Sequence, residues 1–199
     1  MSYLDLKMWE IIPETSPRII KNCSKCGCKS HYINTGNFRV NANGNCIDVW
    51  LIYQCHKCKT TYNLTIYERI KPNKIPSAEY EKYLANDQNL AMQCGFNSEL
   101  LKKNKVVVTY DDVNYQIITG NLKKVSNLRN EQIIVIRSIY ELPQVKLNKI
   151  LALQLGISRT KVKKLIEEGL IYSLNLEDIT KSIIKDGMEI AINTTAIIE

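Results

Sequence analysis

Alternation between apolar and polar side chains dominates the first part of the chain and predicts β-strands. We expect strands at residues 7–13, 38–42, 47–54 and 60–70. Asn43 and Gly44 separate the second strand from the third, and this dipeptide favours a tight hairpin turn. Three apolar residues share one face of the third strand: Val49, Leu51 and Tyr53. Trp50 is out of phase with them, so we expect it on the other face, packed against the N-terminal strand, with stacking on a nucleic-acid base as the alternative.

Beyond Pro72 and Pro76 the spacing of apolar residues becomes helical and then alternates again. Short helices are predicted at residues 77–85, 86–95 and 97–103, followed by strands at 105–110, 113–119 and 131–142. The candidate helix caps are Ser77, Asn86 or Asp87, and Asn97, with Gly95 as a C-terminal stop. Asp111 and Asp112 are adjacent, which places them on opposite sides of a strand, so we interpret them as a turn.

Two further helices are predicted near the C-terminus. The first carries an apolar stripe formed by Leu147, Ile150, Leu151 and Leu155, and Gly156 can end it. Ser158 caps the second, residues 159–168, which turns Val162, Leu165 and Ile166 inward before Gly169. A strand is expected from Gly187. The pattern therefore predicts an α+β protein in three consecutive segments: a β-rich segment at 1–75, a helical and β connector at 76–142, and a helix pair with a strand at 143–199.

Two Cys-x-x-Cys pairs in the first segment indicate a metal site. Each pair lets two thiolates from one tight turn reach a single ion, and the predicted hairpin carries the second pair towards the first. Zn²⁺ takes four such ligands tetrahedrally, which leaves no position for a substrate. We therefore expect a β-rich zinc ribbon with a structural zinc ion bound by Cys23, Cys26, Cys55 and Cys58. Cys28, Cys46 and Cys94, like His31 and His56, are expected to lie outside the ligand set.

The composition suggests a metalloprotein of a reducing compartment. Seven cysteines at ligand spacing, without an export signal or a long apolar run, indicate metal binding rather than disulfides, and we expect the protein to be cytoplasmic and not membrane-bound. No phosphate loop, nucleophile motif or metalloprotease motif is present, so we expect neither an enzyme nor a small-molecule substrate.

Net charge adds a candidate partner. The formal charge of +7 favours an acidic one such as nucleic acid, although four thiolates on one Zn²⁺ would lower it to +5. Six basic residues of the last segment precede its first acidic residue, Glu167: Lys146, Lys149, Arg159, Lys161, Lys163 and Lys164. Because Lys164 can pair with Glu168, we expect Arg159 and Lys163 to be the freest for phosphate contacts.

The helix pair and its strand, KLNKILALQLGISRTKVKKLIEEGLI followed by KDGMEIAI, resemble the αL (S-four-like) RNA-binding domain, named after a small-subunit ribosomal protein. The matching residues are Leu147, Leu151, Leu155, Ser158, Arg159, Leu165, Ile166 and Gly169. Asn148 and Met188 depart from that family's usual Asp. This resemblance implies that the six basic residues bind structured RNA, ribosomal or transfer RNA.

Other interpretations remain open. Ala152, Gly156, Val162 and Leu165 also have the spacing of a helix-turn-helix, which would make the protein a regulator that binds duplex DNA. A zinc-ribbon adaptor that binds another protein is a third possibility. Across nearly the whole chain, and most specifically in FRVNANGNCIDVWLIYQCHKC, the sequence resembles a bacterial family known as domain of unknown function ten-sixty-two, which implies the ribbon architecture but no activity.

Overall fold

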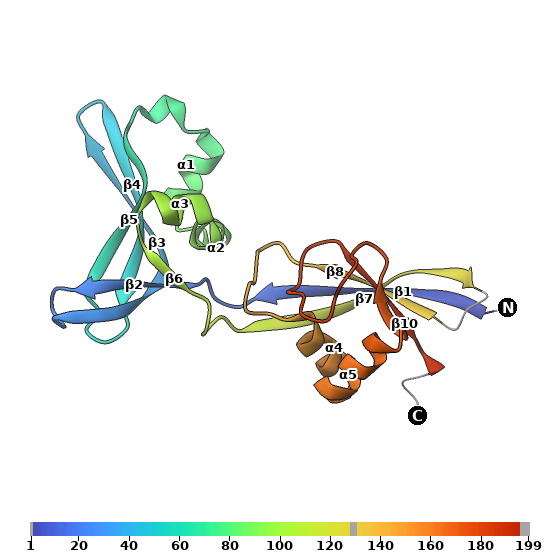
Figure 1. Ribbon diagram of the computed structural model, residues 1–199. Helices are drawn as coiled ribbons and strands as arrows, with labels where there is room; N and C mark the ends of the chain where they lie inside the picture. Colours follow the sequence, from blue (N-terminus) through green and yellow to red (C-terminus); the bar gives the residue numbers. More distant parts are fainter. Residues whose placement is uncertain (1, 128–130, 196–199) are drawn as a thin grey trace. The chain divides into compact units, whose positions relative to one another are not determined.

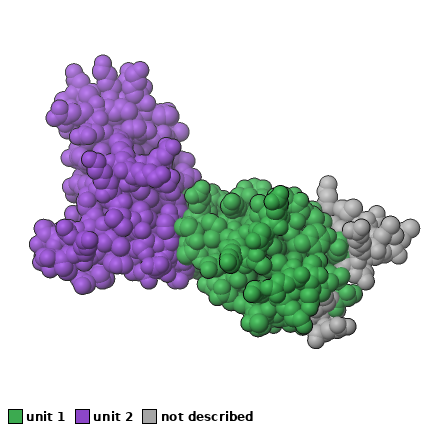
Figure 2. All heavy atoms as spheres, viewed as in Figure 1, with its two compact units in different colours: residues 1–14, 115–199 green, residues 15–114 purple. Residues whose placement is uncertain are grey.

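The computed structural model describes residues 2–127 and 131–195. Contacts divide the chain into two compact units (Figures 1 and 2). Residues 15–114 form one, which we name the cysteine unit, and residues 1–14 with 115–199 form the other, which we name the terminal unit. The fold is thus a mixture of α and β structure with a β-rich N-terminal part, as expected. Among the described helices, none is long and apolar enough to cross a membrane.

The cysteine unit is built on an antiparallel five-stranded sheet in the order β5-β4-β3-β2-β6. Its strands are β2 (Arg18–Cys23), β3 (Cys28–Asn43), β4 (Cys46–Cys55), β5 (Thr61–Ile70) and β6 (Val107–Thr109). The predicted hairpin at Asn43 is present, but β3 begins at Cys28, well before the predicted start at residue 38. The extra length reaches back to the first cysteine pair, so one hairpin links both pairs.

Three short helices cover one face of this sheet (Figure 1). They are α1 (Ser77–Leu84), α2 (Gln88–Phe96) and α3 (Ser98–Lys103), preceded by the single turn η1 (Pro72–Lys74). The side chains of Asp87 and Asn97 cap α2 and α3 as predicted. Pro76, rather than Ser77, precedes α1, and α2 continues through the expected stop at Gly95 to Phe96.

The helices bury the alternate residues of β4 that the sequence pattern had marked. Val49, Leu51 and Tyr53 are fully buried. Tyr83 of α1 packs edge-on against Phe38, with 5.0 Å between ring centroids. Trp50 lies on the other face, half-buried, between Arg39 of β3 and Thr65 of β5 as its cross-strand neighbours. Because one face is packed and the other is not, the sheet has two chemically different surfaces.

The terminal unit contains the second sheet, in the order β7-β1-β8-β10-β9. Its strands are β1 (Ser2–Pro13), β7 (Tyr115–Asn127), β8 (Glu131–Arg137), β9 (Ile171–Ser173) and β10 (Met188–Asn193). β1 pairs antiparallel with β7 and parallel with β8. The N-terminal strand, which we expected to pack on Trp50 within the first segment, is therefore hydrogen-bonded into the other sheet. This pairing is also why the two units differ from the three consecutive segments 1–75, 76–142 and 143–199.

The two predicted C-terminal helices are α4 (Leu147–Leu155) and α5 (Arg159–Glu167). Gly156 ends α4 with a left-handed backbone, φ 66°, a conformation that glycine adopts at little cost. The Ser158 side chain accepts a hydrogen bond from the Lys161 backbone N–H and caps α5. Five apolar side chains of the pair are buried: Leu147, Ile150, Leu151, Val162 and Leu165.

Candidate metal site

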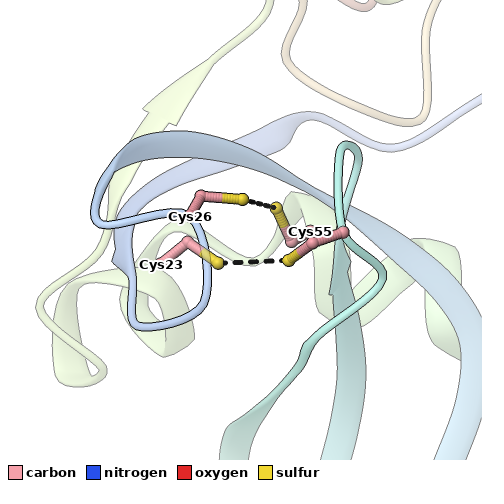
Figure 3. Close-up of side chains that lie close together, drawn as sticks. Cys23, Cys26 and Cys55 are labelled. Atoms are coloured by element: carbon pink, nitrogen blue, oxygen red, sulfur yellow. Dashed lines mark hydrogen bonds between the residues drawn. The ribbon is translucent and has the colours of Figure 1, made fainter.

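The structure brings the four predicted cysteines into one cluster (Figure 3). Cys23 ends β2 and Cys55 ends β4, while Cys26 and Cys58 lie in the turns that follow. All four sulfur atoms lie within 4.8 Å of one another. The Sγ atoms of Cys23 and Cys58 are 3.4 Å apart, and those of Cys26 and Cys55 are 4.0 Å apart. Tetrahedral coordination with metal–sulfur bonds of about 2.3 Å separates sulfurs by about 3.8 Å, so four thiolates at this spacing could hold a metal ion.

The two turns share one backbone design, and we call them the first and second knuckle. The Gly27 N–H donates to the Cys23 carbonyl at 2.9 Å, and the Lys59 N–H donates to the Cys55 carbonyl at 3.0 Å. Each closing residue follows its second cysteine directly and has a left-handed backbone, with φ 66° at Gly27 and 64° at Lys59. Cys-x-x-Cys therefore places both thiols of a pair on the same side of a closed turn.

The sulfur atoms lie among hydrogen-bond donors that favour thiolates. The Tyr32 hydroxyl and the Cys26 backbone N–H lower the pKa of the Cys23 thiol to about 6. Backbone N–H groups of Cys58 and Lys57 also lower the pKa of Cys55. Hydrogen bonding to Cys58 and burial raise the pKa of Cys26 to about 12, because neighbouring sulfurs share protons. Metal binding at neutral pH would therefore release fewer than four protons.

The remaining cysteines and histidines lie outside this group of four. The exposed Cys28 thiol lies 3.9 Å from the Ser30 hydroxyl, and burial raises the pKa of Cys94 to about 12. His56 Nδ1 is 3.2 Å from the His31 carbonyl oxygen, and the two rings meet edge to face. These contacts hold the second knuckle against β3.

The basic residues of the helix pair differ from our expectation at one position. Lys163, expected to be free, forms an ion pair with Glu167 at 3.4 Å, just as Lys164 does with Glu168 at 3.6 Å. Both pairs span four residues of α5, so the same rule predicts both. The prediction that Lys163 is among the freest cations was wrong, because a carboxylate lies one turn away.

The other four basic residues of the pair have no carboxylate partner among the described residues. Arg159 donates through Nη2 to the side-chain oxygen Oδ1 of Asn148 at 3.2 Å, which links the start of α5 to α4. The Lys149 ammonium lies 5.3 Å from the centre of the Tyr115 ring. Lys146 is exposed and precedes α4, and Lys161 is half-buried on the first turn of α5. Cations without a described carboxylate partner therefore lie at the N-terminal ends of both helices.

Charge is distributed unevenly between the units. The cysteine unit holds fourteen Lys or Arg against eight Asp or Glu, and the terminal unit holds thirteen against twelve. The sequence already carried this signal, since residues 1–75 alone hold eleven basic residues against five acidic ones.

Comparison with known families adds one result. A family model described as "Protein of unknown function (DUF1062)" matches residues 40–177, more than half of the chain. The chain belongs to this family. Searches of the curated proteins and of the solved structures found no match. The DUF1062 match includes the second knuckle and both helices of the terminal unit, whereas Cys23 and Cys26 precede it. Of the two resemblances drawn from the sequence, this is the one that the comparisons support.

Proposed function

We propose that the protein is a non-enzymatic, zinc-binding protein that binds structured RNA, ribosomal or transfer RNA, through α4 and α5. The observation that carries the proposal is the group of cations at the N-terminal ends of these helices, where Lys146, Lys149, Arg159 and Lys161 lack carboxylate partners among the described residues. Phosphate groups favour such positions because backbone N–H groups and basic side chains point the same way. Lys163 and Lys164 surround this group but are partly neutralised.

The arrangement around the helices supports an αL-like domain over a helix-turn-helix. β8 precedes α4 in the chain, and β9 and β10 follow α5 in the same sheet. A helix-turn-helix packs its second helix on further helices and inserts it into the major groove. Here the helix pair lies beside strands. In this arrangement the exposed sides of the helices could contact the surface of a folded RNA.

The four-cysteine cluster supports a zinc-ribbon architecture with a structural ion. Thiolates are the ligands that structural zinc sites use, and four of them complete its coordination. A closed shell offers no position at which a substrate could be activated. In this proposal the metal stabilises the two knuckles and takes no part in chemistry.

Binding of a transfer RNA transcript, measured by filter binding at several salt concentrations, tests the proposal. Arg159→Ala with Lys161→Ala should weaken binding and lower the salt slope by about two, or about one per phosphate contact. Lys163→Gln with Lys164→Gln is a matched control that removes the same charge from ion-paired positions and should have the smaller effect. Unchanged affinity and slope in the first variant would refute the proposed site, and preference for duplex DNA would favour the regulator.

A further inference from the structure

The sheet of the cysteine unit has a face that no described element of that unit covers. α1, α2 and α3 all lie on the opposite side (Figure 1). The face presents the half-buried Trp50 and Ile52 beside the exposed Ile33, together with amide and hydroxyl side chains. Those polar side chains are Gln54, Asn63 and Thr65. We name this surface the open face.

Cations border the open face, and carboxylates are scarce around it. Residues 15–67 contain seven Lys or Arg and one acidic residue, Asp48; the next acidic residue, Glu68, is exposed near the end of β5. Asp48 is buried and accepts hydrogen bonds from the Arg69 backbone N–H at 2.7 Å and the Asn43 side chain at 3.2 Å. Its carboxylate is therefore already hydrogen-bonded within the cysteine unit. Arg18 pairs with Asp112, and Lys21 lies over the Tyr62 ring.

Five cations then remain exposed with no carboxylate within ion-pair distance among the described residues. They are Lys25, Lys29, Arg39, Lys57 and Lys59. Four belong to the knuckles or flank them, and the contact between the cysteine pairs brings these four to one end of the unit. Arg39 lies at the opposite part of the same sheet, directly across from Trp50. The charge is more than one closed zinc site needs for neutralisation, since four thiolates on Zn²⁺ leave two negative charges.

The spacing along β3 suits an extended polyanion. Lys29, Ile33 and Arg39 lie on the open face of this strand, on either side of the irregular pairing between Asn34 and Phe38. Ten residues of strand span about 30 Å, which is long enough for several nucleotides. An indole and aliphatic side chains in the centre can pack against base faces, and such faces are accessible only where bases are unpaired.

We propose that the open face binds single-stranded nucleic acid, with Trp50 stacking on a base and with Arg39 and the knuckle lysines contacting phosphates. Amide and hydroxyl groups between them can hydrogen-bond to base edges of any identity. This inference goes beyond the proposed function, because it concerns another unit and unpaired rather than structured nucleic acid. Either proposal can therefore fail while the other stands.

Tryptophan fluorescence provides a direct test, because the chain has two tryptophans and Trp9 is buried in the terminal unit. In the zinc-loaded Trp9→Phe variant of the 199-residue chain, Trp50 is the one remaining tryptophan. Titration with a twelve-nucleotide oligouridylate should quench its emission, because base stacking quenches the indole. Binding by the unsubstituted chain, followed by anisotropy of the labelled oligonucleotide, provides a second measurement that does not depend on Trp9→Phe.

Two variants separate stacking from charge. Trp50→Ala should weaken oligouridylate binding about tenfold with little change in the salt slope. Glutamine in place of Lys25, Lys29, Lys57 and Lys59 should lower the slope by up to about three, at about 0.7 per phosphate. Arg39→Gln gives a third variant that leaves the knuckles and the indole in place, and zinc content with circular dichroism verifies folding of each.

The matched control is Lys163→Gln with Lys164→Gln, which should leave oligouridylate binding unchanged. Absence of quenching, with equal oligouridylate affinity in the Trp50, Arg39 and lysine variants, would overturn the proposal. The open face would then be a better candidate for binding a protein partner. Loss of oligouridylate binding only in Arg159→Ala with Lys161→Ala would also overturn it, because the single strand would then lie on the helix pair.

Discussion

The knuckles and α5 are both lysine-rich, yet they differ in how much of that charge is available. On α5 the side chains of Lys163 and Lys164 each have a carboxylate one turn away. At the knuckles Lys25, Lys57 and their neighbours have none among the described residues. A run of basic residues in a helix commonly carries its own counterions at a spacing of four, whereas turns impose no such spacing. The comparison shows that basic surfaces should be ranked after ion pairing rather than by counting residues.

The largest effect should come from removing a sulfur ligand, because this change should destabilise the cysteine unit and leave the terminal unit folded. Cys26→Ser should release the metal and unfold the cysteine unit, since structural zinc sites contribute about 10–16 kcal/mol of apparent binding free energy, comparable with the whole stability of a domain. Elemental analysis measures the metal content, and hydrogen exchange followed separately in the two units measures the unfolding. Cys28→Ser is the matched control and should retain one metal per chain; the reverse result would replace Cys26 by Cys28 as a ligand.

A smaller effect is expected from the hydroxyl that supports the site. Tyr32→Phe removes the hydrogen bond that does most to lower the pKa of Cys23. The pKa of Cys23 should therefore rise, and its thiolate should bind a proton more readily. Because protons compete with the metal for the sulfur, metal affinity should fall about 10–100-fold. The pH at which half of the metal is released should be higher than in the unsubstituted protein. Metal transfer to a chromogenic chelator between pH 5 and 8 measures this shift. Tyr62→Phe changes another tyrosine of the same sheet and should leave the release profile in place.

The two knuckles can be compared directly at their closing residues. Gly27→Ala places a side chain on a left-handed backbone, and should cost about 1–2 kcal/mol although no atom lies within 4 Å of the added carbon. Lys59→Gly makes the opposite change at the second knuckle and should raise the free energy of unfolding. Chemical denaturation of the metal-loaded protein checks both. Equal destabilisation by the two substitutions would contradict the shared turn design.

The smallest effect should follow from releasing the paired lysines of α5. Glu167→Gln with Glu168→Gln removes both counterions at a cost to stability of about 0.3–0.5 kcal/mol for each exposed pair. If RNA lies on α4 and α5, the freed lysines should raise affinity for the transfer RNA transcript and increase the salt slope. Thermal unfolding and filter binding measure the two quantities separately. Unchanged RNA binding would indicate that this helix face points away from the RNA.

Features determined by neighbouring residues were predictable from the sequence. The two Cys-x-x-Cys turns, the hairpin at Asn43 and the caps at Asp87, Asn97 and Ser158 depend on spacings of a few residues, and the structure has them all. The hairpin then brings the two cysteine pairs together. The Lys163–Glu167 ion pair was equally local, and the rule used for Lys164 would have found it. The two-sided character of β4 followed from alternation alone.

Features determined by distant pairing were not predictable. β1 joins β7 and β8, whose residues are far along the chain, and alternation in a strand does not specify its neighbour. The early start of β3 was hidden because residues 28–37 are mostly polar, although the buried Ser30 and Tyr32 lie among them. The even charge balance of the terminal unit became visible only when its two sequence segments were joined.

The pairing of β1 with β7 also has a consequence for biosynthesis. Pro13 and Tyr115 are cross-strand partners, so the chain leaves the terminal sheet and returns to it at neighbouring points. On the ribosome β1 is made first, yet its partners follow only after residue 114. The four cysteines of the cysteine unit can therefore come together while β1 is still an unpaired strand. A metal held by these cysteines would then be bound before the terminal sheet is complete.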